Sequence, residues 1–157
     1  MDPAQCRRRF GSQPAARLAT LNPDGSPHLV VVVFAVIGDT VYTAVDTKPK
    51  RSRHLRRVTN LQRDPRCSML VDHYTDDWST LWWVRAAGEA SIVDPSDAPD
   101  GLTALTSHYP QYKLLPGPIG PLIAVRVNRW NGWTADPLKD RPPTPPSGAD
   151  RPPASPT

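Results

Sequence analysis

A cluster of basic residues follows a predicted strand, at the point where the chain is expected to enter a helix. Ten consecutive positions hold six cations: Lys48, Lys50, Arg51, Arg53, Arg56 and Arg57. A helix N-terminus presents unpaired N–H groups and the positive end of the helix dipole, and nearby cations add charge-assisted hydrogen bonds. The pattern therefore predicts a phosphate site at Lys48, Lys50 and Arg51. Thr43 or Thr47 could add a hydroxyl.

Two other interpretations of the basic cluster are open. A run of charges often marks a solvated helix face, and we favour that interpretation for Arg53, Arg56 and Arg57. A nucleic-acid surface is the other alternative, but such surfaces interleave aromatic side chains with cations, and the tryptophans of this chain lie elsewhere. We therefore expect no nucleic-acid partner.

A second cluster gathers large aromatic residues beside charged ones. Trp78, Trp82 and Trp83 stand close to Asp76, Asp77 and Arg85. Neighbouring residues of a strand face opposite sides, so one of Trp82 and Trp83 is expected inside the fold, and the other turned toward a planar ligand or a partner chain. Ordinary dimer packing explains the same cluster equally well. For Trp130 and Trp133, packing is the expected role.

Several chemistries lack their usual motifs. His28, His54, His73 and His108 are scattered, and Cys6 and Cys67 have no Cys or His neighbours at metal-ligand spacing. The sequence also lacks the GxSxG, GxGxxG and GxxxxGK patterns. The sequence therefore indicates neither a metal site, nor nucleophilic hydrolysis, nor nucleoside triphosphate chemistry.

Short strands with two helices between them must position these residues. The hydrophobic patterns predict strands at 15–21, 27–36, 40–45, 66–74, 81–93 and 122–127, with helices at 49–62 and 96–109. Asp46 or Thr47 is the expected cap of the first helix. The strand at 27–36 is apolar on both faces and is expected to be buried on both sides. The order favours a mainly β fold, a six-stranded antiparallel barrel with short flanking helices.

The length of 157 residues allows one domain with a sizeable core. Residues 1–135 are assigned to it. Residues 136–157 are rich in Pro, Ser, Asp and Arg and are expected to form a disordered tail. No apolar run is long enough to cross a membrane, and the N-terminus has no signal-peptide pattern, so we expect a cytoplasmic protein.

From Ala15 to Trp133 the chain resembles the pyridoxamine 5′-phosphate oxidase-like split-barrel flavoproteins. The stretches ARLATLNPDGSPHLVVVVFAV and DTVYTAVDTKPKRSRHLRRV carry the resemblance, together with the segment that continues to SIVD. Within that superfamily it is most similar to the deazaflavin (coenzyme F420)-dependent oxidoreductases. The resemblance implies an FMN-binding split barrel that forms a homodimer with sites at the interface. It also implies hydride transfer to or from a small organic substrate.

The resemblance further implies the roles of particular residues. The cofactor ring is expected along Val31, Val32 and Val33, with Trp83 (or Trp82) closing over it. The phosphate is expected at a separate set of residues, namely Tyr42, Thr43, Lys48, Lys50 and Arg51. His28 and Tyr74 are candidate proton donors.

Two departures from the family pattern are visible. Relatives carry a proline in the stretch that reads VVVVF here, so the local kink is expected to be missing. The Arg/His substrate signature of pyridoxamine phosphate oxidases is not recognisable in RVNRWNGWTAD, which argues against vitamin B6 oxidation. An FMN-dependent oxidoreductase and a non-catalytic flavin-, deazaflavin- or haem-binding protein remain the alternatives.

Overall fold

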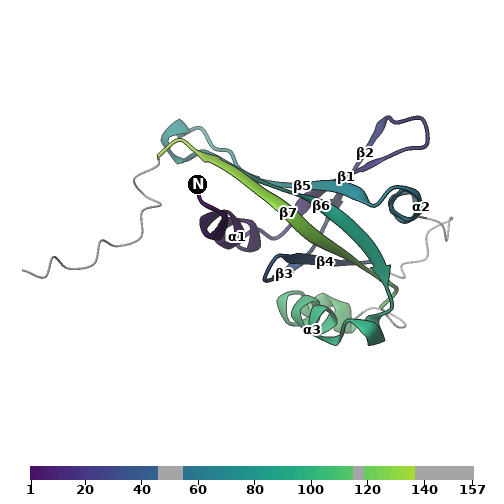
Figure 1. Cartoon of the computed structure of the whole chain (residues 1–157). Helices are drawn as coiled ribbons and strands as arrows, with labels where there is room; N and C mark the ends of the chain where they lie inside the picture. The colour runs from purple at the N-terminus through teal and green to yellow at the C-terminus, as the bar shows by residue number, and fades with distance from the viewer. Residues whose placement is uncertain (46–54, 115–118, 137–157) are drawn as a thin grey trace, which may run out of the picture.

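The computed structural model describes residues 1–45, 55–114 and 119–136. Antiparallel strands make up most of this part of the chain, and short helices flank them (Figure 1). The strands are β1 (Ala16–Leu21), β2 (Pro27–Val32), β3 (Ala35–Ile37), β4 (Thr40–Ala44), β5 (Arg66–His73), β6 (Trp82–Val93) and β7 (Leu122–Thr134). The α-helices are α1 (Pro3–Gly11), α2 (Arg56–Arg63) and α3 (Pro99–His108), and the 3₁₀ turns are η1 (Trp78–Thr80), η2 (Pro95–Asp97) and η3 (Pro110–Leu114).

The seven strands form one sheet in the order β2-β1-β5-β6-β7-β4-β3. The two outermost strands, β2 and β3, are consecutive in the chain and are joined by only Val33 and Phe34. Strands at opposite ends of a sheet can be joined by two residues only if the sheet curls until its ends meet. The predicted mainly β, antiparallel split barrel with flanking helices is confirmed.

One predicted strand is two strands. The segment 27–36 was expected to be continuous, but it breaks at Val33 and Phe34, so the sheet has seven strands instead of six. The break is stabilised by Phe34, whose buried ring lies 4.9 Å from that of Phe10 and whose N–H donates to the Tyr109 hydroxyl at 3.3 Å. The kink that was expected to be missing is therefore present, without a proline.

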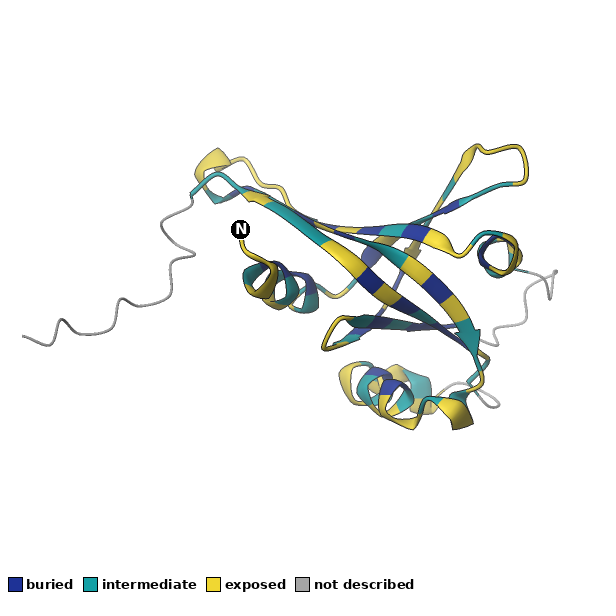
Figure 2. Ribbon diagram, in the orientation of Figure 1, coloured by how far each residue is buried: buried dark blue, intermediate teal, exposed yellow. Residues whose placement is uncertain are grey.

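The expected burial of that segment on both sides is also wrong. In β2 the side chains alternate, so Val32 faces the barrel interior and is 6% exposed, while Leu29 and Val31 are 64% and 70% exposed. Figure 2 shows this alternation of buried and exposed positions along the sheet. The exposed face of β2 therefore carries large apolar side chains.

The N-terminal helix α1 was not predicted, although its start signal is present in the sequence. The Gln5 N–H donates to the Asp2 side chain and the Asp2 N–H donates to the Gln5 side chain, both at 2.8 Å, which is a capping box. Pro3 occupies the first turn, where its missing N–H costs nothing. Cys6 and Phe10 are fully buried, so α1 completes the barrel core.

Helix α2 is shorter than predicted, and helix α3 packs against the sheet. The helix predicted for 49–62 is observed as α2 from Arg56 to Arg63, and its cap position Leu55 makes no side-chain cap hydrogen bond. The expected caps Asp46 and Thr47 lie outside the described residues. Helix α3 packs on β3 and β4. Its Gly101 is needed there, because a Cβ would lie 2.5 Å from the Tyr42 ring.

Candidate functional site

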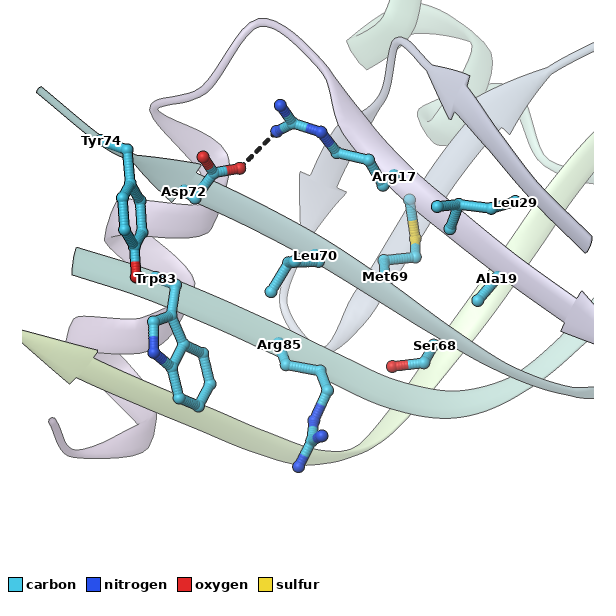
Figure 3. Close-up of a pocket in the computed structure, with 10 residues that line it drawn as sticks. All are labelled: Arg17, Ala19, Leu29, Ser68, Met69, Leu70, Asp72, Tyr74, Trp83 and Arg85. Atoms are coloured by element: carbon cyan, nitrogen blue, oxygen red, sulfur yellow. Dashed lines mark hydrogen bonds and ion pairs between the residues drawn. The ribbon is translucent and has the colours of Figure 1, made fainter. Parts of the chain in front are cut away.

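The outer face of the sheet holds a groove of about 620 Å³. It crosses β2, β1, β5 and the start of β6, on the side of the sheet that faces away from the barrel core. Its lining residues, drawn in Figure 3, are Arg17, Ala19, Leu29, Ser68, Met69, Leu70, Asp72, Tyr74, Trp83 and Arg85. Small-molecule pockets have volumes of roughly 300–1,000 Å³, so the groove is large enough for a ring system.

Small side chains make the groove hollow. Strand register places Leu29, Ala19, Ser68 and Ala87 side by side across four strands. Ala19 and Ser68 lack the bulk of Leu29 beside them, and Ala87 continues the row beyond the groove. Two strand spacings separate Ala19 from Ala87, about 10 Å. A flat bicyclic or tricyclic ring matches that width.

The next row across the sheet carries charge. Register places Val31, Arg17, Leu70 and Arg85 side by side. Arg17 is paired, because its Nη1 donates to the Asp72 Oδ1 at 2.5 Å. The Arg85 side chain is exposed and has no hydrogen bond or ion pair within the described ranges. The groove therefore presents one uncompensated positive charge.

Aromatic side chains close one end of the groove. Trp83 lies opposite Asp72 on one side and Trp133 on the other. Figure 3 shows Trp83 and Arg85 extending in the same direction from β6, with Tyr74 beside Trp83. Tyr74 is 64% exposed, so its ring is available to a ligand. The groove thus combines flat aromatic surfaces, a cation and a floor of small residues.

The expected separation of Trp82 and Trp83 is confirmed. Trp82 lies on the other side of β6, where it packs against the core. The Arg9 guanidinium lies 4.9 Å from the centre of its ring, and the His73 ring stacks on it with a centroid distance of 6.1 Å. These residues line a second pocket of about 210 Å³. The expected packing of Trp130 is confirmed by its edge contact with Phe10.

The residues predicted along the cofactor ring divide between two faces. Val31 lies on the outer face beside Arg17, three strand spacings (about 14 Å) from Arg85 and farther from Trp83. Val32 points into the barrel. Val33 is 37% exposed at the bend between β2 and β3. Only Val31 and Trp83 of this set share the outer face with the groove.

Two of the residues predicted at the phosphate, Tyr42 and Thr43, do not line the groove. Tyr42 packs among the residues beneath α3, and Thr43 is buried with 1% exposure. Lys48, Lys50 and Arg51 lie outside the described residues. Helix α2 begins at Arg56, and the phosphate site at Lys48, Lys50 and Arg51 stays a prediction.

Sequence reasoning missed Arg17 and Asp72 and gave Arg85 no role. The signal was available in the alternation of β1, where Arg17 and Ala19 occupy the face opposite to Ala16 and Leu18. Tyr74, a candidate proton donor, lines the groove, whereas His28 does not. The His28 Nδ1 is buried and has no hydrogen-bond partner among the described residues.

Other reactive groups give no competing site. The described ranges contain no group of three or more His, Cys, Asp or Glu residues arranged to hold a metal ion. Burial raises the pKa of the Cys67 thiol to about 12, which keeps it protonated and unreactive. No helix in the described part of the chain has the length and apolar character needed to span a membrane.

Comparison with known proteins identifies close structural relatives. The family model described as pyridoxamine 5′-phosphate oxidase matches residues 3–134. The conserved hypothetical protein Rv2991 from Mycobacterium tuberculosis is 25% identical with a TM-score of 0.69, and the match covers 95% of this chain and 94% of that one. The FAD binding protein from Mycobacterium smegmatis is 19% identical, with 85% and 96% covered and a TM-score of 0.63. A heme binding protein of the same organism is 20% identical with a TM-score of 0.65, and the match covers 87% of this chain and 62% of that one.

Proposed function

The chain belongs to the pyridoxamine 5′-phosphate oxidase family, and from that premise we propose that it is an oxidoreductase using bound coenzyme F420. In this proposal the protein transfers a hydride to or from a small organic substrate. One observation supports the proposal most directly. The groove on the outer face of the barrel joins the Trp83 ring, the unpaired Arg85 guanidinium and a floor of small residues.

The groove fits the planar substrate of a redox cofactor in shape and chemistry. Its small-residue row leaves room for a flat ring, and Trp83 and Tyr74 offer aromatic contacts at its end. When bound, a deazaflavin or flavin supplies the hydride-transfer chemistry, and the protein supplies position, exclusion of water and electrostatics. Leu29 and Leu70 flank the floor and exclude water from a substrate ring placed on it.

The phosphate of the cofactor is assigned to Lys48, Lys50 and Arg51, together with Tyr42 and Thr43. The support is the density of cations in this segment and the resemblance to the family. Deazaflavin carries an anionic tail beyond its phosphate, and Arg56 and Arg57 follow on α2, where Arg56 is exposed. This additional positive charge favours coenzyme F420 over FMN, which has one phosphate and needs fewer cations.

We propose further that two chains pair through the outer face. Four large apolar residues of β2, β5 and β7 are exposed on the side of the sheet that carries the groove. They are Leu29 (64% exposed), Val31 (70%), Leu70 (38%) and Trp133 (45%). Large apolar side chains gathered in the open on one face mark interaction sites in soluble proteins. A partner on this face would wall the groove and complete two equivalent sites.

The similarity to FAD and heme binding proteins raises a second candidate function, cofactor binding without turnover. For haem, the groove lacks the most usual protein ligands. His and Cys are common axial ligands of haem iron, and the ten residues that line the groove include neither. Met and Tyr also ligate haem iron, but Met69 is fully buried, so Tyr74 is the one lining residue that offers haem an exposed ligand.

Equilibrium binding tests the cofactor assignment. Coenzyme F420, FMN and haemin are titrated into the full chain, and the cofactor's own fluorescence or absorbance is followed. We expect F420 to bind most tightly. Lys50→Ala combined with Arg51→Ala should weaken it by about 1.5–3 kcal/mol for each charged hydrogen bond lost. Arg126→Ala, which removes an exposed arginine of β7, is the matched control and should leave the affinity unchanged.

Turnover separates an enzyme from a binding protein. Reduced F420 bound to the chain is mixed with candidate acceptors, and the recovery of oxidised cofactor absorbance is measured. Oxidation that depends on the acceptor supports the oxidoreductase. Tight binding of F420 with no oxidation by any acceptor supports the binding protein, and failure of F420 and FMN to bind would reject both.

A further inference from the structure

The groove has an uneven charge, because only one of its two arginines is neutralised. Arg17 is held by Asp72 at 2.5 Å, so this pair contributes no net charge. Arg85 stands on the neighbouring strand with no acidic partner in the described part of the chain. A guanidinium beside apolar surface binds a carboxylate or similar anion through two parallel hydrogen bonds. The groove is therefore suited to an occupant with a single negative charge.

A second polar group lies close to Arg85. Ser68 is directly opposite Ala87, and Arg85 is two residues from Ala87 on the same face of β6. Such diagonal neighbours are about 7–8 Å apart at their Cα atoms, a distance that an arginine side chain spans. The Ser68 hydroxyl has no hydrogen-bond partner within the described ranges. Arg85 and Ser68 can thus donate to one anionic group at the edge of the small-residue row.

The rest of the groove selects for a flat apolar body. Ala19 and Ser68 form a low floor that Ala87 extends to a length of about 10 Å, and Leu29 and Leu70 bound it. Trp83 stands next to Arg85 along the outer face of β6, so a ring bound by its acid group at Arg85 also meets an aromatic surface. A bulky, non-planar molecule would lose these contacts.

From this arrangement we propose that Arg85 is the substrate-recognising residue of the groove and that the substrate is a planar aromatic compound bearing one anionic group, such as a carboxylate. The inference rests on the proposed function for the identity of the reaction, but the binding itself depends only on the groove. Arg17 does not compete for the anion, because its guanidinium is already paired with the Asp72 carboxylate. Arg85, Ser68 and Trp83 are the three residues that define the specificity.

The test uses three probes with the full chain. Planar anionic 2-naphthoate is compared with neutral 2-naphthamide and with cyclohexanecarboxylate, an anion that is not planar. Binding is followed by quenching of tryptophan fluorescence, with and without saturating F420. We expect 2-naphthoate to bind at least tenfold more tightly than either other probe, and to bind together with F420.

Variants then assign the anion contact. Arg85→Gln should weaken the binding of 2-naphthoate by about 10- to 100-fold and leave the affinity for 2-naphthamide unchanged. Arg85→Lys should recover part of the lost affinity. Arg126→Gln removes an exposed arginine from the outer surface of the adjacent strand and should have no effect. Circular dichroism confirms that each variant is folded.

Several outcomes would overturn the proposal. They are no binding of 2-naphthoate, equal binding of the acid and the amide, and unchanged affinity in Arg85→Gln. Displacement of 2-naphthoate by F420 would also overturn it, because the groove would then hold the cofactor ring. If the chain binds 2-naphthoate through Arg85 but binds neither F420 nor FMN, the proposed function fails while the anion site stands.

Discussion

The Trp130 indole N–H donates to the Asp39 carboxylate at 2.8 Å, and the Arg7 guanidinium holds the same carboxylate oxygen at 2.6 Å. Three separate segments of the chain therefore meet at one side chain: α1, the turn between β3 and β4, and β7. The hydrogen bond from Trp130, followed by that from Arg7, lowers the pKa of Asp39 below its usual value.

Asp39 should make stability depend on pH in the acid range. Because its pKa is lower in the folded chain, its contribution is present above the unfolded value, about 3.9, and is lost as the pH falls through the lowered value. Asp39→Asn should reduce the melting temperature at about pH 7, and the difference from wild type should vanish in strong acid. Thermal melts followed by circular dichroism measure this difference in melting temperature at each pH. Asp76→Asn, an exposed control, should match wild type throughout.

Phe10→Ala should remove the main anchor of α1. The Phe10 side chain is fully buried between Phe34 and Trp130, with ring centroids 4.9 Å and 5.3 Å away. A buried Phe→Ala change costs about 3–5 kcal/mol, which urea unfolding detects. Arg8→Ala on the exposed side of the same helix should change stability by less than about 0.5 kcal/mol. Equal effects of the two changes would contradict the role given to α1.

Gly101→Ala should destabilise the chain although alanine favours helices. Alanine gains about 1 kcal/mol over glycine in a helix interior, but here its Cβ would lie 2.5 Å from the Tyr42 ring. We expect a net loss of about 1–3 kcal/mol. In the background of Tyr42→Ala the same change should become neutral or stabilising, and a double-mutant cycle by urea unfolding measures this coupling. A stabilising effect in the wild-type background would show that the ring moves freely.

Val31→Lys should convert the proposed dimer into a monomer. Val31 is the most exposed of the apolar residues on the groove face, and a lysine would place a desolvated charge in the interface. Analytical ultracentrifugation measures the mass in solution. Ile37→Lys changes an exposed apolar residue of β3 and serves as the control. A wild-type monomer, or an equal effect of Ile37→Lys, would reject the outer face as the interface.

Cys67 should resist alkylation in the folded chain. Burial raises its pKa to about 12, so the thiol keeps its proton at a pH where an unfolded cysteine ionises, near 8.5. The stability linked to this proton is complete below about pH 8.5 and is lost as the pH rises toward 12. Iodoacetamide at about pH 9 should label Cys67 slowly, and rapidly in urea. In a Cys6→Ala background, mass spectrometry follows this one site, and rapid labelling of folded chain would contradict its burial.

Local patterns predicted most of the fold. Alternating or apolar runs located β1, β4, β5 and β6 to within a residue or two, and the apolar side formed by Leu102, Leu105 and Tyr109 located α3. The start of β7 was located, but its extension to Thr134 was not, because polar residues such as Asn131 do not signal a strand. The bend at Val33–Phe34 depends on the contacts of Phe34 with Phe10 and Tyr109, which lie far away in the sequence.

The candidate site was predicted less well than the fold. Trp83 could be nominated because adjacent strand residues face opposite ways, and the structure places it in the groove. Arg17 and Arg85 could not be related, since their adjacency arises from the pairing of β1 with β5 and of β5 with β6. Strand order is a property of the whole chain, and no local pattern contains it.

The contact between α1 and β7 has a consequence for biosynthesis. Phe10 is translated about 120 residues before its partner Trp130. Until then the nascent helix has an uncovered apolar side, a state that invites aggregation and chaperone binding. Pairing of β4 with β7 imposes a similar delay, and such long-range contacts slow folding. We expect this barrel to complete its core only after nearly all of its last strand has been translated.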